Sequence, residues 1–341
     1  MRTAVVSGVI AAIVGVIMLL TKNDPSGPNA DMVIGIASGA AYGLVAVGIV
    51  IVYKGARVFN FAQGEFGTIA AFTAFVLMEQ VDSVFGNKVD IPYYVAAPAA
   101  IFFTILIGLI LERGVVRPLL NAPRVNLLVA TIAFSLLAIG IEILLFRPEP
   151  KVLQPLIQTV DKATGKPVGP EIFGYFLEPQ RIVIIGVLVV MAIALGYFFS
   201  RTNLGLAVLA TSQDPLATRV VGIGVERMSQ FIWASAAFFG AVAGILYVPL
   251  SGLAPGAVTS AILIPAFAAA VIGGMTSLPG AFVGGVVVGL IQGLAGWASN
   301  HFYLGEQTWS LIVPGAIDVA LVVTLLAVLL VRPQGLLGSE A

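Results

Sequence analysis

The chain has 341 residues, of which 59% are hydrophobic and only 10% are charged, and its formal net charge is zero. Soluble domains carry about 25% charged residues, so much of this surface must be covered by lipid rather than by water. The neutral charge argues against a nucleic-acid partner, the absence of cysteine excludes disulfides and thiolate metal sites, and the single histidine, His301, excludes a histidine metal cluster.

Apolar runs recur along the chain, and a run of about 20 residues is long enough to cross the hydrocarbon core of a bilayer. The first run, from Ala4 to Leu20, resembles a signal peptide, but its length and the lack of an A-x-A cleavage site favour a retained helix. An all-α polytopic membrane protein is therefore expected, with residues 1–341 forming a single transmembrane domain. Ten membrane spans are predicted, at 4–20, 32–53, 61–79, 93–111, 127–146, 181–199, 230–250, 259–275, 279–298 and 309–331.

The eighth and ninth spans are rich in small residues and are separated only by Thr276–Leu278. Residues 259–298 are therefore expected to form either two complete spans or a re-entrant hairpin of broken helices. Both alternatives leave the two termini on the same side of the membrane. Arginine in short loops favours the cytoplasmic side, and nine of the eleven arginines lie there if the N-terminus is inside. The predicted orientation is N-in and C-in.

Two hydrophilic segments interrupt the spans. Residues 147–180 contain six prolines and are placed outside the cell as an extracytoplasmic loop. Residues 200–230 are placed inside, where Asp214 followed by Pro215 predicts the start of a short amphipathic helix that ends near Gly222. An exposed cytoplasmic helix can dock into a groove on a partner, although an ordinary connecting loop remains the alternative.

Ionisable residues inside membrane spans are costly, and they usually face the interior of the bundle or a water path. Three acids within the predicted spans are candidates for such a role: Glu65, Glu142 and Asp318. For Glu142 the alternative is a side chain that reaches outward to the interface, and for Asp318 it is a pair with a neighbouring helix.

Glu65 is the most informative of these acids, because Asn60, Gln63 and Gly64 place further polar groups and a flexible glycine just before it. The alternative is that Glu65 is an acid at a helix start, stabilised by the helix dipole and paired with Arg57.

Catalytic motifs are missing from the sequence. It contains no G-x-x-x-x-G-K-[ST], no H-E-x-x-H and no G-x-S-x-G pattern. An enzymatic function is therefore not expected, and no cofactor is expected in this chain. If transport is driven by ATP, another subunit must bind ATP and its magnesium ion.

Four stretches together resemble the LivH-type permeases of branched-chain amino acid ABC transporters. They are Gly39–Tyr53 with Arg57–Phe66 (R-V-F-N-F-A-Q-G-E-F), Ala210–Ile223 (A-T-S-Q-D-P-L-A-T-R-V-V-G-I), Ala266–Ala281 (A-F-A-A-A-V-I-G-G-M-T-S-L-P-G-A) and Arg332–Leu336 (R-P-Q-G-L). They occur in the family's order and span most of the chain from about residue 32 to 337. The family commonly has histidine where Gln63 stands, and glutamine cannot titrate near neutral pH.

The resemblance implies an importer subunit in the cell inner membrane. Its implied partners are a second, LivM-type permease, two ATP-binding cassette subunits and an extracytoplasmic substrate-binding protein. It also implies that residues 200–230 form the coupling loop that meets the ATPase, through Asp214, Arg219 and Gly222. The expected substrate path comprises Asn60, Gln63, Gly64, Glu65, Gly273 and Gly274.

The expected function is transport of branched-chain amino acids or related small amino acids and amides. A secondary transporter driven by an ion gradient is the alternative, with Glu65 or Asp318 as the coupling acid. An intramembrane enzyme is disfavoured, because one histidine and no cysteine cannot supply a thiol nucleophile or a histidine-based metal set.

Overall fold

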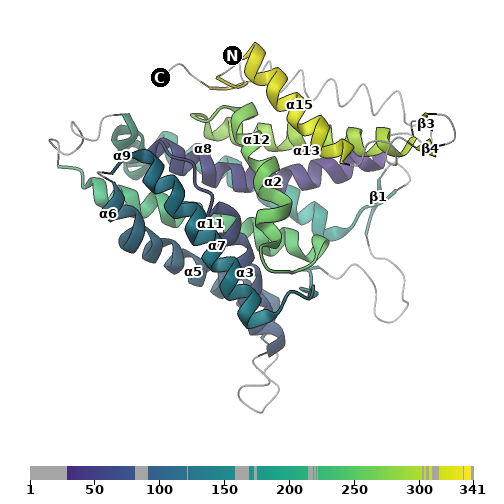
Figure 1. Ribbon diagram of the computed structural model, residues 1–341, viewed down its shortest axis with the longest axis horizontal. Coiled ribbons are helices and arrows are strands. Elements are labelled where there is room, and N and C mark those ends of the chain that lie inside the picture. Colours follow the sequence, from purple (N-terminus) through teal and green to yellow (C-terminus); the bar gives the residue numbers. More distant parts are fainter. Residues whose placement is uncertain are drawn as a thin grey trace. The chain divides into compact units, whose positions relative to one another are not determined.

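The computed structural model (Figure 1) describes residues 29–80, 91–120, 122–157, 169–172, 175–213, 218, 220, 222–301, 303–304, 307–308, 315–332 and 334–338. Contacts between Cα atoms divide the chain into two compact units. The first comprises Met1–Ala46, Ile157–Leu188 and Pro265–Ala341, and the second comprises Val47–Leu156 and Val189–Ile264. The first predicted span, 4–20, lies outside the described residues.

Helices make up nearly all of the regular structure in the described part. They are α2 (Asn29–Ala56), α3 (Gln63–Phe75), α5 (Tyr93–Leu111), α6 (Arg117–Leu119), α7 (Arg124–Phe146), α8 (Pro179–Arg201), α9 (Asn203–Gln213), α11 (Val225–Ser251), α12 (Ile264–Gly273), α13 (Leu278–His301) and α15 (Ala316–Val331). Three π-helical turns are η1 (Val76–Gln80), η2 (Glu112–Val116) and η3 (Thr259–Leu263). Two short antiparallel pairs join β1 (Glu171–Ile172) to β2 (Tyr175–Phe176) and β3 (Tyr303–Leu304) to β4 (Gln307–Thr308).

Six helices in the described ranges are long and apolar enough to cross a membrane: Asn29–Ala56, Tyr93–Leu119, Arg124–Phe146, Pro179–Phe199, Val225–Ser251 and Leu278–Ser299. All six coincide with predicted spans. Thr259–Gly273 and Ile317–Val331 are shorter apolar helices. The third predicted span, 61–79, coincides with α3 and η1, which follow each other from Gln63 to Gln80 but are not among these six helices. The polytopic helical fold is thus confirmed, whereas ten complete spans are not.

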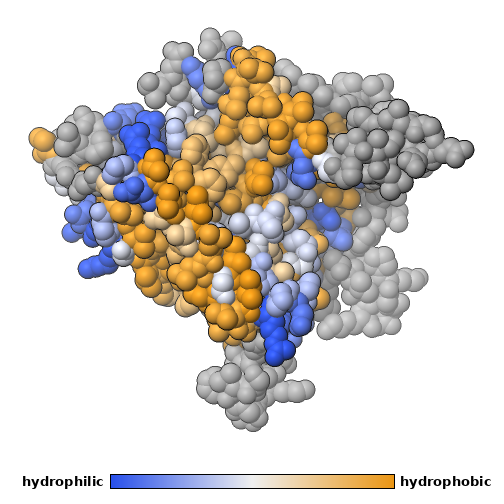
Figure 2. Space-filling model, viewed as in Figure 1, coloured by the Kyte–Doolittle hydropathy of each residue, from blue (hydrophilic) through white to orange (hydrophobic). Residues whose placement is uncertain are grey.

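The surface of the described part is strongly apolar. Hydrophobic residues cover much of the face seen in Figure 2. Among the described residues, Phe102 on α5 is 63% exposed and Leu144 on α7 is 83% exposed. Large side chains exposed in this way would be unfavourable in water but are stable against lipid tails.

The first unit is held together by close contact between glycine-rich helix faces. Gly39 on α2 lies against Gly285 on α13, where a Cβ atom on Gly39 would come within 2.5 Å of the Gly285 carbonyl oxygen. Small residues let two backbones approach and gain dispersion energy, which is the main source of helix association in lipid. These glycines are therefore packing residues.

A tight turn joins α12 to α13. Gly274 has a φ of +108°, a conformation that favours glycine, and the Ser277 hydroxyl accepts a hydrogen bond from the Gly280 amide at 3.1 Å. Residues 259–298 therefore form a short helical segment, Thr259–Gly273, followed by one helix of spanning length. The C-terminal segment closes back on this turn, since the Leu336 amide donates to the Ile272 carbonyl oxygen at 2.7 Å.

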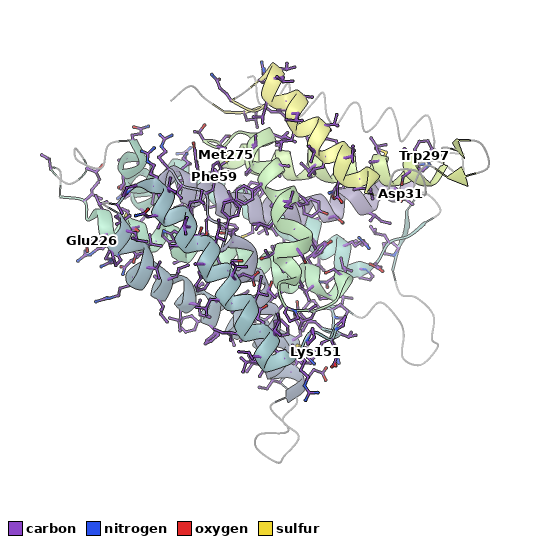
Figure 3. All side chains as sticks on the ribbon, in the orientation of Figure 1. Asp31, Phe59, Lys151, Glu226, Met275 and Trp297 are labelled. Carbon is purple, nitrogen blue, oxygen red and sulfur yellow. The ribbon has the colours of Figure 1, made fainter. Side chains whose placement is uncertain are left out.

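In the second unit, α3 packs against both α5 and α11. Gly67 on α3 faces Gly244 on α11 so closely that a Cβ on Gly244 would overlap the Gly67 backbone. At one end of this unit the backbones of Lys151 and Leu253 form a two-way bridge at 2.7 and 2.9 Å. Glu226 lies at the opposite end (Figure 3).

Candidate functional site

The polar run before α3 is folded into the interior. After α2 ends, Asn60 accepts a hydrogen bond from the Ala62 amide at 3.0 Å, forming a turn that leads into α3. The side-chain nitrogen of Asn60, Nδ2, donates to the Gln63 side-chain oxygen at 3.2 Å. Both side chains are fully buried, so this short network satisfies polar groups that lipid could not hydrate.

Gln63 connects three helices. Its Nε2 donates to the Ala236 carbonyl oxygen on α11 at 2.8 Å. A Cβ atom on Gly48 of α2 would collide with that nitrogen, and one on Gly240 of α11 would lie 3.1 Å from it. Glycine at both positions therefore makes room for the Gln63 amide, which binds α3 to α11 beside α2.

Two buried glutamates lie close to each other in the second unit. Glu65 on α3 is fully buried, and its carboxyl faces Glu142, Thr259 and Ser135. Glu142 on α7 is 4% exposed, and its Oε2 accepts a hydrogen bond from the Gly256 amide at 2.9 Å. The structure thus pairs two acids far apart in sequence. It excludes the alternative in which Glu142 reaches outward.

Four buried polar atoms in the described part lack a hydrogen-bond partner, and all belong to this cluster: Glu65 Oε1, Glu65 Oε2, Glu142 Oε1 and Thr259 Oγ1. An unpaired buried polar group usually costs about 1–3 kcal/mol, and an unpaired charge costs more. We refer to Glu65, Glu142 and Thr259 as the acid cluster. Four unpaired oxygen atoms gathered in an otherwise apolar bundle indicate a functional site.

The chain segment between α11 and η3 shapes this cluster. Gly256 has a φ of +66°, and its amide points to Glu142. Further along the segment, the Val258 amide donates a hydrogen bond to Thr68 Oγ1 at 3.2 Å. A Cβ on Gly64 would collide with the Thr259 hydroxyl, so the predicted glycine beside Glu65 serves to admit Thr259.

A groove of about 500 Å³ adjoins the cluster, between α3, α5 and α7. Its described lining is apolar apart from Thr73 and Glu142, and the Thr73 hydroxyl donates to the Ile69 carbonyl oxygen at 2.7 Å. Glu142 therefore contributes the one unpaired polar atom among the described lining residues.

The remaining predicted site residues lie elsewhere. Gly273 and Gly274 belong to the first unit, where Gly273 packs against Gly280 and Gly274 forms the turn after α12. Gly222 has a φ of +84° and is exposed before α11. Asp214 and Arg219 lie outside the described residues.

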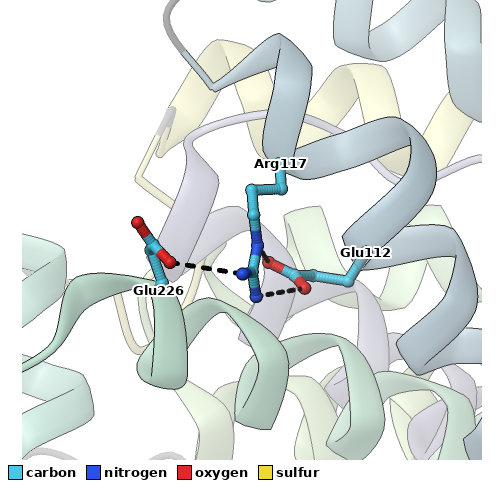
Figure 4. A network of polar contacts seen from close by, with 3 residues as sticks. All are labelled: Glu112, Arg117 and Glu226. Atoms are coloured by element: carbon cyan, nitrogen blue, oxygen red, sulfur yellow. Dashed lines mark hydrogen bonds and ion pairs between the residues drawn. The ribbon is translucent and has the colours of Figure 1, made fainter.

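A charged network ties the start of α11 to η2 and α6, which follow α5 (Figure 4). Arg117 donates to fully buried Glu112 at 3.0 and 3.4 Å, and to Glu226 at 3.2 Å. Sequence inspection did not single out these residues. The helix α9 was also missed, although Thr202 gave a capping signal, since its hydroxyl accepts a hydrogen bond from the Gly205 amide at 3.0 Å.

The third acid, Asp318, is exposed in the first turn of α15. No group of three or more histidine, aspartate and glutamate side chains could hold a metal ion in the ranges that the structure describes. The acid cluster instead offers acceptors for hydrogen-bond donors and for a positive charge.

Known proteins similar to this chain are transport permeases. A family model described as "Branched-chain amino acid transport system / permease component" matches residues 31–323. The chain is 28% identical over 310 residues to the high-affinity branched-chain amino acid transport system permease protein BraD of Pseudomonas aeruginosa, with 90% of this chain and 95% of that protein covered.

Two LivH proteins show similar agreement. Identity is 27% over 303 residues to the probable branched-chain amino acid transport permease protein LivH of Methanocaldococcus jannaschii, covering 87% of this chain and 88% of that protein. The identity to the high-affinity branched-chain amino acid transport system permease protein LivH of Escherichia coli is 27% over 307 residues, which cover 89% of this chain and 93% of that protein. No solved structure matches the chain significantly.

Proposed function

Because the chain belongs to the family of permease components of branched-chain amino acid transport systems, we propose that it forms part of the membrane passage of an ABC importer. The chain is a transport subunit and not an enzyme. The proposed substrates are branched-chain amino acids or related small amino acids and amides. The observation that carries the proposal is the family match, which extends over residues 31–323 and so includes both units.

The complete assembly would contain a second, LivM-type permease, two ATP-binding cassette subunits and an extracytoplasmic substrate-binding protein. In this arrangement the chain crosses the cell inner membrane ten times, with both termini inside. The binding protein delivers the solute from outside, and ATP and magnesium act only in the partner ATPases. Residues 147–180 would then lie on the side of the binding protein.

Coupling to the ATPase is assigned to the loop 200–230, through Asp214, Arg219 and Gly222. Two described contacts support transmission from this loop. Arg117 on α6 joins Glu226, in the first turn of α11, to Glu112 on η2, which directly follows α5. Phe198 stacks on Phe231 with ring centroids 5.5 Å apart. A push on the loop would therefore reach α5, α8 and α11 together.

The proposed substrate path contains Asn60, Gln63, Gly64 and Glu65, together with Gly273 and Gly274. Support for the first four comes from the buried polar network and the acid cluster in the second unit. Support for the two glycines comes from the tight turn after α12, where Gly274 adopts a backbone conformation that only glycine reaches readily. Rearrangement around such a turn could open or close a passage.

The experiment is uptake of labelled leucine by proteoliposomes that contain the chain with its genomic partners. Uptake that requires ATP, the ATPases and the binding protein supports the importer. Uptake that persists without ATP and collapses with the proton gradient would instead establish the ion-driven alternative. Substituting Gly222 by valine should reduce ATP-driven uptake without dissociating the permease pair, because φ of +84° is strained for any residue with a branched side chain.

A further inference from the structure

The groove between α3, α5 and α7 combines an apolar wall with one acid. Phe72, Phe134 and Ile141 are among its lining residues, and Glu142 Oε1 is the unpaired polar atom within that lining. A lipid tail or an apolar side chain could occupy such a wall. Neither would satisfy a carboxylate, so the acid points to an occupant that also carries hydrogen-bond donors.

An independent observation comes from Glu65, which does not line the groove but lies behind Glu142. Its side chain is fully buried, neither of its carboxyl oxygens has a hydrogen-bond partner, and it faces Glu142. Two carboxylates in a low-dielectric interior repel each other strongly unless a positive charge lies between them. No lysine or arginine pairs with either acid in the part of the chain that the structure describes.

A proton or an ammonium group could supply that charge, and the open atoms distinguish the two. One shared proton would supply a single donor between the two carboxyl groups. A primary ammonium group has three N–H donors, and the cluster has four open oxygen atoms from three side chains. The ammonium group therefore fits the acceptors better.

We propose that Glu65, Glu142 and Thr259 bind the primary ammonium group of a small solute whose hydrocarbon part lies in the groove between α3, α5 and α7. The site selects a cationic head and an apolar body. Identifying that solute as a branched-chain amino acid rests on the proposed function, whereas the ammonium site itself does not.

Binding of labelled 3-methylbutylamine to the full chain, assembled with its partners in nanodiscs, tests the site. Saturable binding is expected, with displacement by L-leucine and no displacement by 4-methylpentanoate, which has the same branched body but no amine. Glu142→Gln and Glu65→Gln should each weaken the affinity roughly tenfold or more, because each removes a charge-assisted acceptor. Glutamine keeps the shape of either side chain and an oxygen for the Gly256 amide.

Glu79→Gln is the matched control. Glu79 is exposed on η1, hydrogen-bonds to Gln154 at 3.1 Å, and lies outside the groove lining, so its neutralisation should leave binding unchanged. Thr259→Val should weaken binding without a change of charge. It provides the test of the site if a glutamate variant fails to elute as an intact assembly.

Three results would overturn the site: no saturable binding to the unmodified chain, equal displacement by 4-methylpentanoate, or unchanged affinity in the glutamate and threonine variants. The first would leave a shared proton as the occupant of the cluster, and the second would identify the groove as a lipid or apolar pocket. ATP-driven leucine uptake separates the two proposals. If ATP-driven leucine uptake is normal but amine binding is unchanged in the glutamate variants, the ammonium site is rejected and the importer stands. If amine binding depends on the glutamates but no ATP-driven uptake occurs, the importer is rejected and the ammonium site stands.

Discussion

Arg117 has two acidic partners in very different surroundings, and this contrast allows a quantitative prediction. Glu112 is fully buried and receives two hydrogen bonds from the guanidinium group, whereas the Glu226 side chain is 65% exposed. Removing one partner of a buried ion pair typically costs about 3–5 kcal/mol, because the remaining charge is left uncompensated. An exposed pair typically contributes about 0–1 kcal/mol.

Arg117→Met should therefore destabilise the chain by about 3 kcal/mol, at the lower end of the buried range because the Arg117 side chain is itself 26% exposed. Glu226→Gln should cost less than about 1 kcal/mol. The double variant Arg117→Met with Glu112→Gln should recover part of the loss, since a neutral amide is cheaper to bury than a carboxylate.

The assay is reversible unfolding of the purified chain in mixed micelles with increasing SDS, followed by tryptophan fluorescence. The expected order of stability tests the prediction. The unmodified chain should be the most stable, Glu226→Gln should be close to it, the double variant should be less stable, and Arg117→Met should be the least stable. A double variant that is less stable than Arg117→Met would refute the reasoning, because the penalty could not then come from an orphaned Glu112 charge.

Two further variants test the packing of the second unit in the same assay. Gly244→Val should destabilise the chain by about 1–3 kcal/mol, because its Cβ would overlap the Gly67 backbone. Gly140→Val is the control and should change stability little, because the space around Gly140 is open. Equal losses in the two variants would argue against close packing of α3 on α11. Gln63→Leu should destabilise the chain by about 1–3 kcal/mol, because Asn60 and the Ala236 carbonyl each lose a buried partner. An unchanged midpoint of SDS unfolding would show that the network does not hold the helices together.

Hydropathy was sufficient to predict most of the helices. Spans 32–53, 93–111, 127–146, 181–199, 230–250 and 279–298 all lie within helices of spanning length, because twenty apolar residues have few alternatives to a membrane helix. Composition could not predict that Thr259–Gly273 would be short, or that the helix begun by α3 would change to π-helical geometry at Val76. Those lengths depend on neighbouring helices and on local strain.

The candidate site was only partly predictable. Glu65 and Glu142 were identified individually, because isolated acids in apolar runs are rare. The Gly256 amide that bonds to Glu142 lies 114 residues away in the sequence, and no periodicity encodes that contact. Thr259 gave no signal at all, since a lone hydroxyl in a membrane helix usually bonds to its own backbone.

The departure from the family pattern at position 63 also has a structural explanation. Gln63 uses its amide oxygen and nitrogen at the same time, toward Asn60 and the Ala236 carbonyl, and neither contact requires a titrating group. A neutral amide therefore suffices for the bridge seen between α3 and α11.

The contact between the C-terminal segment and α12 has a consequence for biogenesis. The Leu336 and Leu337 amides donate to the Ile272 and Gly273 carbonyl oxygens at the end of α12. Because a ribosome makes α12 well before residues 334–338, these carbonyl groups lack that protein partner while α13 and α15 are being synthesised. The end of α12 can therefore complete these hydrogen bonds only after residues 334–338 have been synthesised, which is later than the synthesis of α15.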